Sequence, residues 1–346
     1  MKRNGITAAG TWSVDYTKVI TQFPQEGSCT SILSETVDNG GAPYNLLVDL
    51  CRLGVRFPLR AVGRVGQDMD GASIIKDCKA HDFDTTHLKA VPEASTSFSD
   101  VIISRENGVR TSFHYSGSNG LLSVRDFDFE TDKSRIFYLG SLFFLPSLDA
   151  ADERRGTQAA TLLSMARKQG LLTCVDIERA NVDPEVFKHG SRAALQETDL
   201  IILNVEVAEL LTGVGIRSRW GVEMEAAFSA AAMLLNYGQA RCAVIRFPAG
   251  AIALTAQGEK VSEGSINLPK NRMVSAAGSG HAFTAGFLCQ YHDNRPLNLC
   301  LQAAHAAAAA CLMDRTASAG IKPLGTCLGL LDQFGQRNMD AMTVSV

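Results

Sequence analysis

Short apolar runs alternate with longer amphipathic patterns along most of this chain. The expected strands are Ile6–Ala9, Val101–Ser104, Ile136–Leu139, Leu172–Asp176, Leu200–Leu203, Cys242–Arg246 and Ala251–Thr255. The expected helices are Pro43–Leu53, Ala72–His81, Glu153–Gln169, Glu223–Tyr237, Ala282–His292 and Leu297–Met313. Strands this apolar must be buried on both sides, so the alternation predicts an α/β fold with a mostly parallel central sheet flanked by helices. Ligands of such sheets bind at the carboxyl ends of the strands.

Two segments interrupt this alternation, at about 14–40 and 95–116. Both are polar and contain short pieces rich in β-branched residues. The second reads as two strands joined by Asn107-Gly108, a strong hairpin signal. Neither segment fits within a doubly wound sheet, so together they predict a small β lid above the site. We expect residues 1–346 to form a single α/β domain that carries this lid.

Charge and cysteine usage exclude several classes of protein. The net charge is −3, which provides no basic footprint for nucleic acid or an anionic membrane. No apolar run approaches the roughly 18 residues that a membrane span needs, and the N-terminus lacks the apolar core of a signal peptide. The nine cysteines are an odd number, are scattered and include no CxxC. We therefore expect reduced thiols and a cytoplasmic protein.

A small-residue loop runs directly into a helix at Val274–Phe287. Gly278 and Gly280 allow the backbone to approach a ligand closely, and Ser279 lies where a cap is expected. Free N–H groups at a helix start suit an anion such as phosphate. The same pattern also starts ordinary helices, so by itself this signal is weak.

A second glycine-rich helix start lies at Gly40-Gly41-Ala42-Pro43-Tyr44-Asn45. Pro43 suits the first helical turn, and the Asn45 amide offers both a donor and an acceptor to a hydroxylated ligand. An ordinary helix start is the competing interpretation. Further along, Gly63–Gly71 reads as a strand-to-helix turn with Asp68 as a plausible N-cap.

In this order and at these spacings, the motifs resemble those of the PfkB (ribokinase-like) carbohydrate kinases. The stretch from Gly40 to Gly71 resembles the first family signature, in which GG-x-x-x-N leads into G-x-V-G-x-D-x-x-G. The stretch from Ser275 to Phe287 resembles the second, DTxGAGDxFxxGF. Smaller similarities occur at Gly10–Asp15, Gly117–Asn119 and Leu139–Ser141, so the resemblance covers nearly the whole chain.

The resemblance implies a ribokinase-like fold and ATP-dependent phosphoryl transfer to a sugar or sugar-like hydroxyl, with ATP and Mg²⁺ as cofactors. It also implies a homodimer formed through the lid. It assigns an anion hole to Gly278, Ser279 and Gly280. The implied substrate-binding residues are Asp15, Gly40, Gly41, Asn45 and Asn119. For Asp15, a solvated loop carboxylate is the alternative.

Four departures from the family pattern fall on the phosphate and nucleotide side. His281 replaces the catalytic Asp, and Ser275-Ala276 replaces Asp-Thr. The family's N-x-x-E falls on Asn204, but the glutamate comes one residue early, at Glu206. Of the motif T-L-G-x-x-G, only Gly250 remains. The resemblance therefore assigns nucleotide binding to Asn204, Glu206 and Gly250, and metal binding to Glu206, with weakened affinity for ATP-Mg²⁺.

Two functions follow from the histidine at position 281. A helix N-terminus disfavours the charged imidazole, so we expect a largely neutral His281 at neutral pH that accepts the proton of the sugar hydroxyl. The chain would then be a sugar kinase, impaired by the other departures. Alternatively, His281 only caps or packs, and the chain is a pseudokinase that binds a sugar or related small molecule without transferring phosphate. A kinase with an unusual phosphate donor or metal arrangement is the third possibility.

Overall fold

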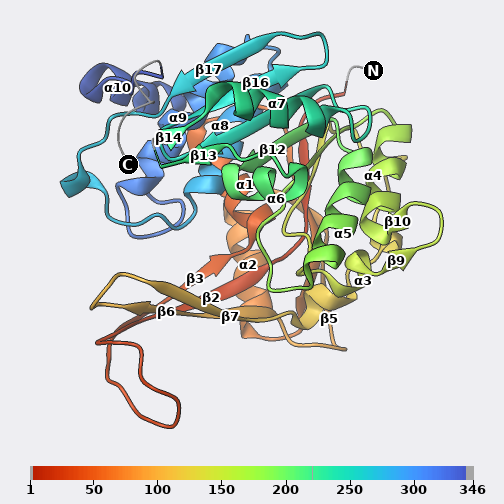
Figure 1. The fold of residues 1–346 in the computed structure, drawn as a ribbon. Helices are drawn as coiled ribbons and strands as arrows, with labels where there is room; N and C mark the ends of the chain where they lie inside the picture. The colour runs from red at the N-terminus through yellow and green to blue at the C-terminus, as the bar shows by residue number, and fades with distance from the viewer. Residues whose placement is uncertain (1–2, 220, 340–346) are drawn as a thin grey trace.

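The computed structural model describes residues 3–219 and 221–339, and within them nine strands form one sheet (Figure 1). Its order is β17-β16-β15-β12-β11-β8-β1-β4-β5. Every pair from β15 to β5 is parallel, whereas β16 is antiparallel to both of its neighbours. The strands are β1 Ile6–Ala9, β4 Leu59–Gly66, β5 Asp84–Val91, β8 Ile136–Leu139, β11 Leu172–Val175, β12 Leu200–Asn204, β15 Cys242–Phe247, β16 Gly250–Thr255 and β17 Lys260–Gly264.

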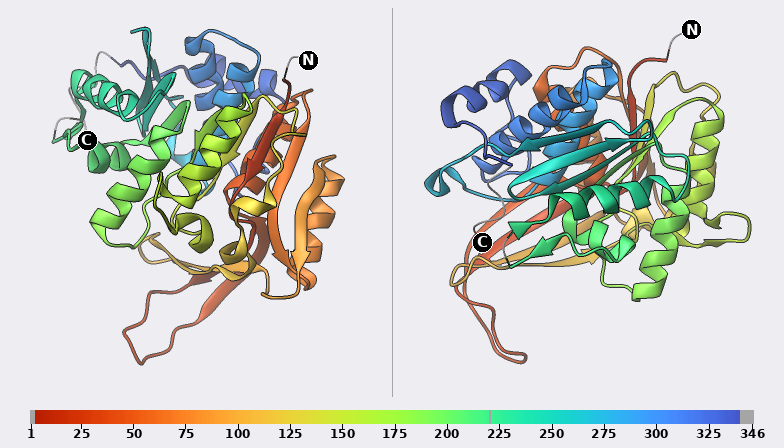
Figure 2. Two further views of the ribbon diagram at one scale, coloured as in Figure 1. Left: turned by 90° about the vertical axis from the view of Figure 1, so that its right-hand side faces the viewer. Right: turned by 45° about the horizontal axis from the view of Figure 1, so that its top comes forward.

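Helices cover both faces of this sheet (Figure 2). Successive residues of a strand alternate between two cores: Ile136 and Tyr138 pack into one, Phe137 and Leu139 into the other. The first core includes helices α1 Ala42–Leu53, α2 Met69–Ala80, α8 Ser279–His292, α9 Leu297–Leu312 and α10 Leu324–Phe334. The second includes α3 Pro146–Asp149, α4 Gln158–Lys168, α5 Pro184–Gln196, α6 Val205–Thr212 and α7 Met224–Leu235. The expected α/β architecture is confirmed.

Some boundaries differ from the sequence-based expectation. The helix expected from Glu153 begins only at Gln158, because Ala151–Asp152 (β9) pairs with Gly156–Thr157 (β10). Thr157 then caps the helix by accepting from the Ala160 N–H. Strands β4 and β5 were not expected, since charged residues and glycines interrupt their apolar patterns. Helices α5, α6 and α10 were not expected either.

Four strands form a second sheet that projects below the main one in Figure 1, and we call it the lid sheet. Its strands are β2 Ser13–Ile20, β3 Ile32–Gly40, β6 Ser97–Ser104 and β7 Arg110–Tyr115, in the order β3-β2-β6-β7. They come from the two segments, 14–40 and 95–116, that interrupt the sequence pattern. Strands β2 and β6 pair in parallel, so the two segments are joined at the centre of the lid sheet.

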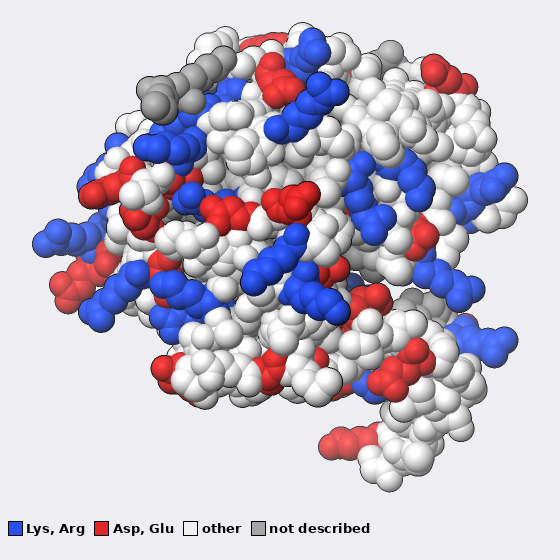
Figure 3. Space-filling model, turned by 180° about the vertical axis from the view of Figure 1, so that it is seen from behind, with Lys and Arg blue, Asp and Glu red and all other residues white. Residues whose placement is uncertain are grey.

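The surface carries charges of both signs. On the face shown in Figure 3, basic and acidic side chains are interspersed. None of the helices in the described part of the chain combines the length and apolar character needed to cross a bilayer.

Helix α1 begins at a glycine that no other residue can replace without strain. Gly41 has φ 96°, and a Cβ there would lie 1.9 Å from the carbonyl oxygen of Thr11. The close approach holds the start of α1 against the loop between β1 and β2. Gly54 ends the same helix with φ 83°, but a Cβ there would meet nothing within 4 Å.

This difference provides a matched test. Gly41→Ala combines backbone strain with a steric overlap and should lower the free energy of unfolding by about 2–5 kcal/mol. Gly54→Ala carries only the left-handed strain and should cost about 1–2 kcal/mol. Urea denaturation of both variants measures the difference. Equal losses would contradict the proposed contact between Gly41 and Thr11.

Candidate functional site

Polar side chains gather at the carboxyl edge of the main sheet, where β11 and β15 end and α8 begins. Asp176 follows β11 directly, and Glu178 lies two residues further on. Arg246 lies near the end of β15, opposite Asn204 of β12. His281 lies in the first turn of α8. We call Asp176, Glu178, Arg246 and His281 the charged cluster.

His281 lies between two carboxylates. Its Nε2 is 3.4 Å from Asp176 Oδ2 and 3.5 Å from Glu178 Oε1. Burial lowers the pKa of His281, but Asp176 and Glu178 outweigh it and raise that pKa to about 9. The expectation of a neutral imidazole at neutral pH is therefore wrong. The helix N-terminus by itself disfavours the charged ring, but the fold also brings two carboxylates to it.

The pKa values of the two carboxylates, Asp176 and Glu178, shift in opposite directions. Burial raises the pKa of Asp176, but His281 and Arg246 outweigh it, so the pKa falls below its usual value. The pKa of Glu178 is raised by burial and by the neighbouring charge of Asp176. Asp176 is therefore the principal counter-ion of the imidazolium.

The other edge of His281 faces the residues expected to hold the sugar. Its Nδ1 lies 3.5 Å from the Asn45 Nδ2 of α1. Asn45 Oδ1 is buried without a hydrogen-bond partner among the described residues, so it is an unsatisfied acceptor at this site. Asn45 and His281, 236 positions apart in sequence, thus lie side by side.

Asp15 reaches the site from the lid sheet. On β2 it pairs with Asp38 of β3 and with Ser99 of β6. Burial raises the pKa of Asp15, and Arg110, Ser99 and His281 oppose this effect. A Cβ at Gly40 would lie 2.7 Å from Asp15 Oδ2, so the glycine leaves room for this carboxylate. The structure thus brings Asp15, Gly40, Asn45 and His281 to one region.

The expected anion loop forms the start of α8. Gly278 has φ 77°, and a Cβ there would lie 2.4 Å from the Ala317 carbonyl oxygen. Ser279 donates its hydroxyl to the Ala276 carbonyl at 2.9 Å, and no side chain caps the helix. A Cβ at Gly280 would lie 2.6 Å from Arg246 Nη2. The first turn of α8 therefore lies directly against a guanidinium group.

Asn119 has a different role from the expected one. It is completely buried, its Nδ2 donates to the Trp12 carbonyl at 3.0 Å, and its Oδ1 accepts from the Trp12 N–H at 3.1 Å. The amide thus holds the chain that leads into β2 and does not offer itself to a ligand. We correct its assignment from substrate contact to support of Trp12.

The expected nucleotide-side residues also have structural partners. Asn204 caps α6 by accepting from the Val207 N–H at 2.8 Å. Glu206 is 53% exposed and pairs with Arg217 at 3.0 Å. A Cβ at Gly250 would lie 2.5 Å from the Met339 sulfur. Within the described ranges, the group whose ligand atoms could meet around a metal is Asp176, Glu178 and His281, without Glu206.

The sequence motifs do not identify three residues of this site, Asp176, Glu178 and Arg246. A signal for two of them was present, because Asp176 and Arg246 end strands that the sequence predicts. A charged residue at the carboxyl end of a buried parallel strand lies where ligands bind. The place of Glu178, in the loop after β11, depends on the path of that loop.

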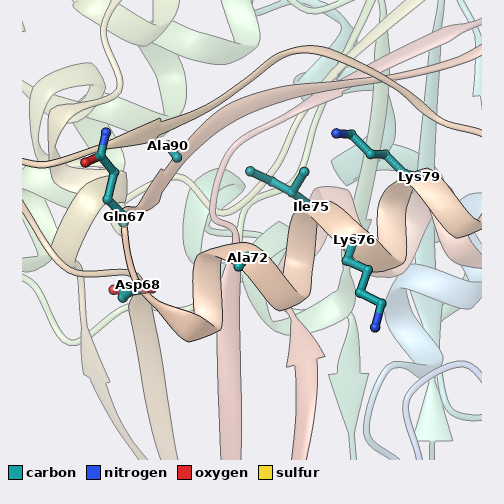
Figure 4. A pocket seen from close by; sticks show the side chains of 8 residues that line it. Gln67, Asp68, Ala72, Ile75, Lys76, Lys79 and Ala90 are labelled. Carbon is teal, nitrogen blue, oxygen red and sulfur yellow. The ribbon is translucent and has the colours of Figure 1, made fainter.

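A surface cavity of about 550 Å³ lies apart from this site, between α2 and β5 (Figure 4). Asp68, at its rim, accepts from the Gly71 N–H at 2.8 Å, so its expected role as N-cap is confirmed. The lining residues are Gly66, Gln67, Asp68, Ala72, Ile75, Lys76, Lys79 and Ala90.

Known structures share this architecture. Arabidopsis thaliana ribokinase complexed with ribose and ATP superposes with a TM-score of 0.77 at 18% identity, covering 95% of this chain and 99% of its own. The nucleoside kinase of Methanocaldococcus jannaschii has a TM-score of 0.74 at 17% identity, with 96% and 99% coverage. The chain therefore has the ribokinase-like fold. In sequence, it is 24% identical to the mouse ribokinase over 298 residues, which cover 84% of each chain.

The sequence also matches the pfkB family carbohydrate kinases over residues 13–323. This match spans most of the chain and includes both signatures. The chain belongs to the pfkB family of carbohydrate kinases.

The protonation of His281 can be measured directly. In an NMR titration of the histidine rings, His281 should titrate near 9, because Asp176 and Glu178 favour its charged form. Asp176→Asn removes the principal counter-ion and should lower that pKa. His305, whose pKa burial lowers to about 4, is the internal control and should not change. A His281 pKa that is the same in both proteins would contradict the assigned ion pair.

Proposed function

We propose that this protein transfers the terminal phosphoryl group of ATP to a hydroxyl of a sugar or sugar-like small molecule. The main observation behind this proposal is that Asn45 Nδ2 lies 3.5 Å from His281 Nδ1, at the start of α8. Asp15 approaches the same point from the lid sheet. Family membership supports the reaction class, and a ribokinase of the same fold is described in complex with ribose and ATP.

In this proposal, Asp15 and Asn45 bind the hydroxyls. A carboxylate accepts from two hydroxyls, and the unpartnered Asn45 Oδ1 accepts from another. A buried site built on such bonds rejects analogues that lack the hydroxyl, because its polar groups are then unsatisfied. Gly40 leaves room for the Asp15 carboxylate, and Gly41 lets the start of α1 lie against the Thr11 carbonyl.

His281 is the proposed proton acceptor. Its Nε2 faces Asp176 and Glu178, which leaves Nδ1 toward Asn45 and the ligand. The attacking hydroxyl would form a bond to the terminal phosphorus, release its proton to Nδ1 and displace ADP. The ring must first lose its own proton, and its pKa of about 9 makes this unfavourable at neutral pH. Turnover should therefore rise with pH up to that value.

The residues present do not fit a resident Mg²⁺ ion. Magnesium prefers oxygen ligands in an octahedron, whereas the candidate group Asp176, Glu178 and His281 includes a ring that is protonated at neutral pH. That imidazolium already neutralises the carboxylate it faces. The proposed proton transfer therefore involves only the residues of the chain.

A sugar-binding pseudokinase is the second candidate. It is favoured by one observation, the protonated histidine at the position where the family carries a carboxylate base.

The nine cysteines of the described residues are all free, which supports our placement of the protein in the cytoplasm.

One assay series tests both candidates. A panel of pentoses, hexoses, sugar acids and nucleosides is offered with ATP, and binding and ADP release are measured separately between about pH 6 and pH 10. A kinase should show turnover that increases toward alkaline pH. Asp15→Asn should weaken binding of the accepted sugar by about 10- to 100-fold, because a charged acceptor is lost.

The outcomes separate cleanly. Binding without ADP release at any pH would identify the pseudokinase. No binding across the whole panel would refute the assigned pocket. Turnover that is independent of pH would refute His281 as the acceptor. Lys18→Met is a suitable control on β2, because Lys18 pairs with Asp100 and Glu35 within the lid sheet.

We also propose a homodimer formed through the lid sheet. Residues adjacent along a strand face opposite sides, so the row of Val37 and Phe113 faces away from the row of Asp15 and Ser99. Val37 is 55% exposed and Phe113 is 56% exposed. Both lie on the edge strands β3 and β7, which also present unpaired backbone groups.

Light scattering at tens of micromolar should give the mass of a dimer. Because charges on an apolar contact face oppose burial, the double variant Val37→Asp, Phe113→Asp should be monomeric. Met69→Asp, at an 89% exposed position on α2, is the control and should remain dimeric. A monomeric wild-type protein would refute the proposal.

A further inference from the structure

The guanidinium of Arg246 is a half-buried cation without a bonded partner among the described residues. It makes no hydrogen bond and no ion pair with any residue in the ranges 3–219 and 221–339. It lies deep in the molecule, and burial lowers its pKa despite the opposing charges of Asp176 and Glu178. The side chain is still partly reached by solvent, as expected for the floor of a pocket. Its donors make no bond to the described residues and stay within reach of a ligand that enters from solvent.

The surroundings of this guanidinium favour an anion. Its Nη2 would lie 2.6 Å from a Cβ at Gly280, so it packs against the first turn of α8. That turn presents uncapped backbone N–H groups and the positive end of a 14-residue helix. The imidazolium of His281 is the next residue along. Three sources of positive charge therefore converge on one place.

The nearby carboxylates do not cancel this charge. Asp176 and Glu178 both lie within 3.5 Å of His281 Nε2, whereas neither lies within ion-pair distance of Arg246. Asp49 of α1 and Asp15 of β2 also face His281, and burial holds the pKa of Asp49 up at about 8, so it is largely uncharged at neutral pH. Arg246 is thus a cation of the site whose hydrogen-bonding capacity remains available, and Arg110 of the lid sheet adds positive charge near Asp15 and Glu178.

We propose that Arg246 binds the terminal phosphates of the donor together with the first turn of α8, and that this binding does not require a divalent metal ion. The inference deepens the proposed function and rests on it for the identity of the donor. A planar guanidinium matches two phosphate oxygens at once, and such charge-assisted pairs are strong. Arg246 would supply beside the phosphates the positive charge that an ion usually supplies in phosphoryl transfer.

A purely structural role is the competing explanation. Arg246 would then serve only as a distant counter-charge to Asp176, and its removal would lower stability without changing anion affinity. The two roles separate if anion binding and unfolding are measured on the same variants.

The probe is inorganic tripolyphosphate. Its binding to the protein is measured by isothermal titration calorimetry in the presence of EDTA. Wild-type protein should bind it, and Arg246→Met should weaken binding by about 10- to 100-fold, because several charge-assisted hydrogen bonds are lost. Arg246→Lys keeps the charge but lacks the planar pair of donors, so its affinity should lie between those of the wild type and Arg246→Met. Arg241→Met is the matched control, since Arg241 immediately precedes β15, pairs with Asp199 at the end of the strand opposite Arg246 and is 62% exposed at its side chain.

Equal affinity in wild type and Arg246→Met, with both proteins folded by circular dichroism, would overturn the proposal. Binding that appears only when Mg²⁺ replaces EDTA would overturn its metal-free part. Because the probe contains no sugar and no turnover is measured, failure of the proposed kinase reaction would leave this result intact. Conversely, sugar phosphorylation that survives Arg246→Met with an unchanged KM for ATP would refute Arg246 and retain the kinase.

Discussion

The main sheet is buried on both faces, and this constraint decides where chemistry can occur. Residues of β8 and β12 alternate between two apolar cores, so neither face of these strands has room for an unpaired charge. On the central strands β11, β12 and β15, charged side chains occur only at or just beyond the strand ends. Asp176 and Arg246 lie at the carboxyl ends of β11 and β15, and the first turn of α8 is directed at the same edge. The site is thus a consequence of how the sheet is covered.

The charge distribution within that site differs from the pattern that the family signature describes. A histidine stands where the signature has a carboxylate, and Asp176 and Glu178 supply the missing negative charge from another strand. Arg246 then adds a second cation beside the anion loop. In this chain the carboxylates beside position 281 come from the end of β11 and the loop after it, and Arg246 lies against the start of α8.

The two sides of strand β2 in the lid sheet face different environments, one toward the site and one away from it. On β2, Asp15 faces Asp38 and Ser99, while Tyr16 lies in the row of Val37 and Phe113. One row is polar and reaches the site, and the other ends in exposed apolar side chains. Because adjacent residues alternate in direction, a change of register by one position would exchange these two faces.

The sequence by itself determined the architecture and one half of the site. Apolar periodicity predicted β1 and β8 at their observed bounds, and the two glycine-rich helix starts pointed to Asn45 and His281, which lie 3.5 Å apart. These features depend on local patterns that each segment carries within itself. Asn119 shows the limit of such patterns, because its side chain forms both of its hydrogen bonds with the backbone of Trp12, more than 100 positions away.

Only the tertiary structure decided the protonation of His281 and the environment of Arg246. Both depend on charges that arrive from separate strands, and Coulomb interactions depend on distance in space and on burial. Asp176 lies about a hundred residues before His281 in the chain, yet their side chains are 3.4 Å apart. No local pattern records that separation, because it is set by the order of strands in the sheet.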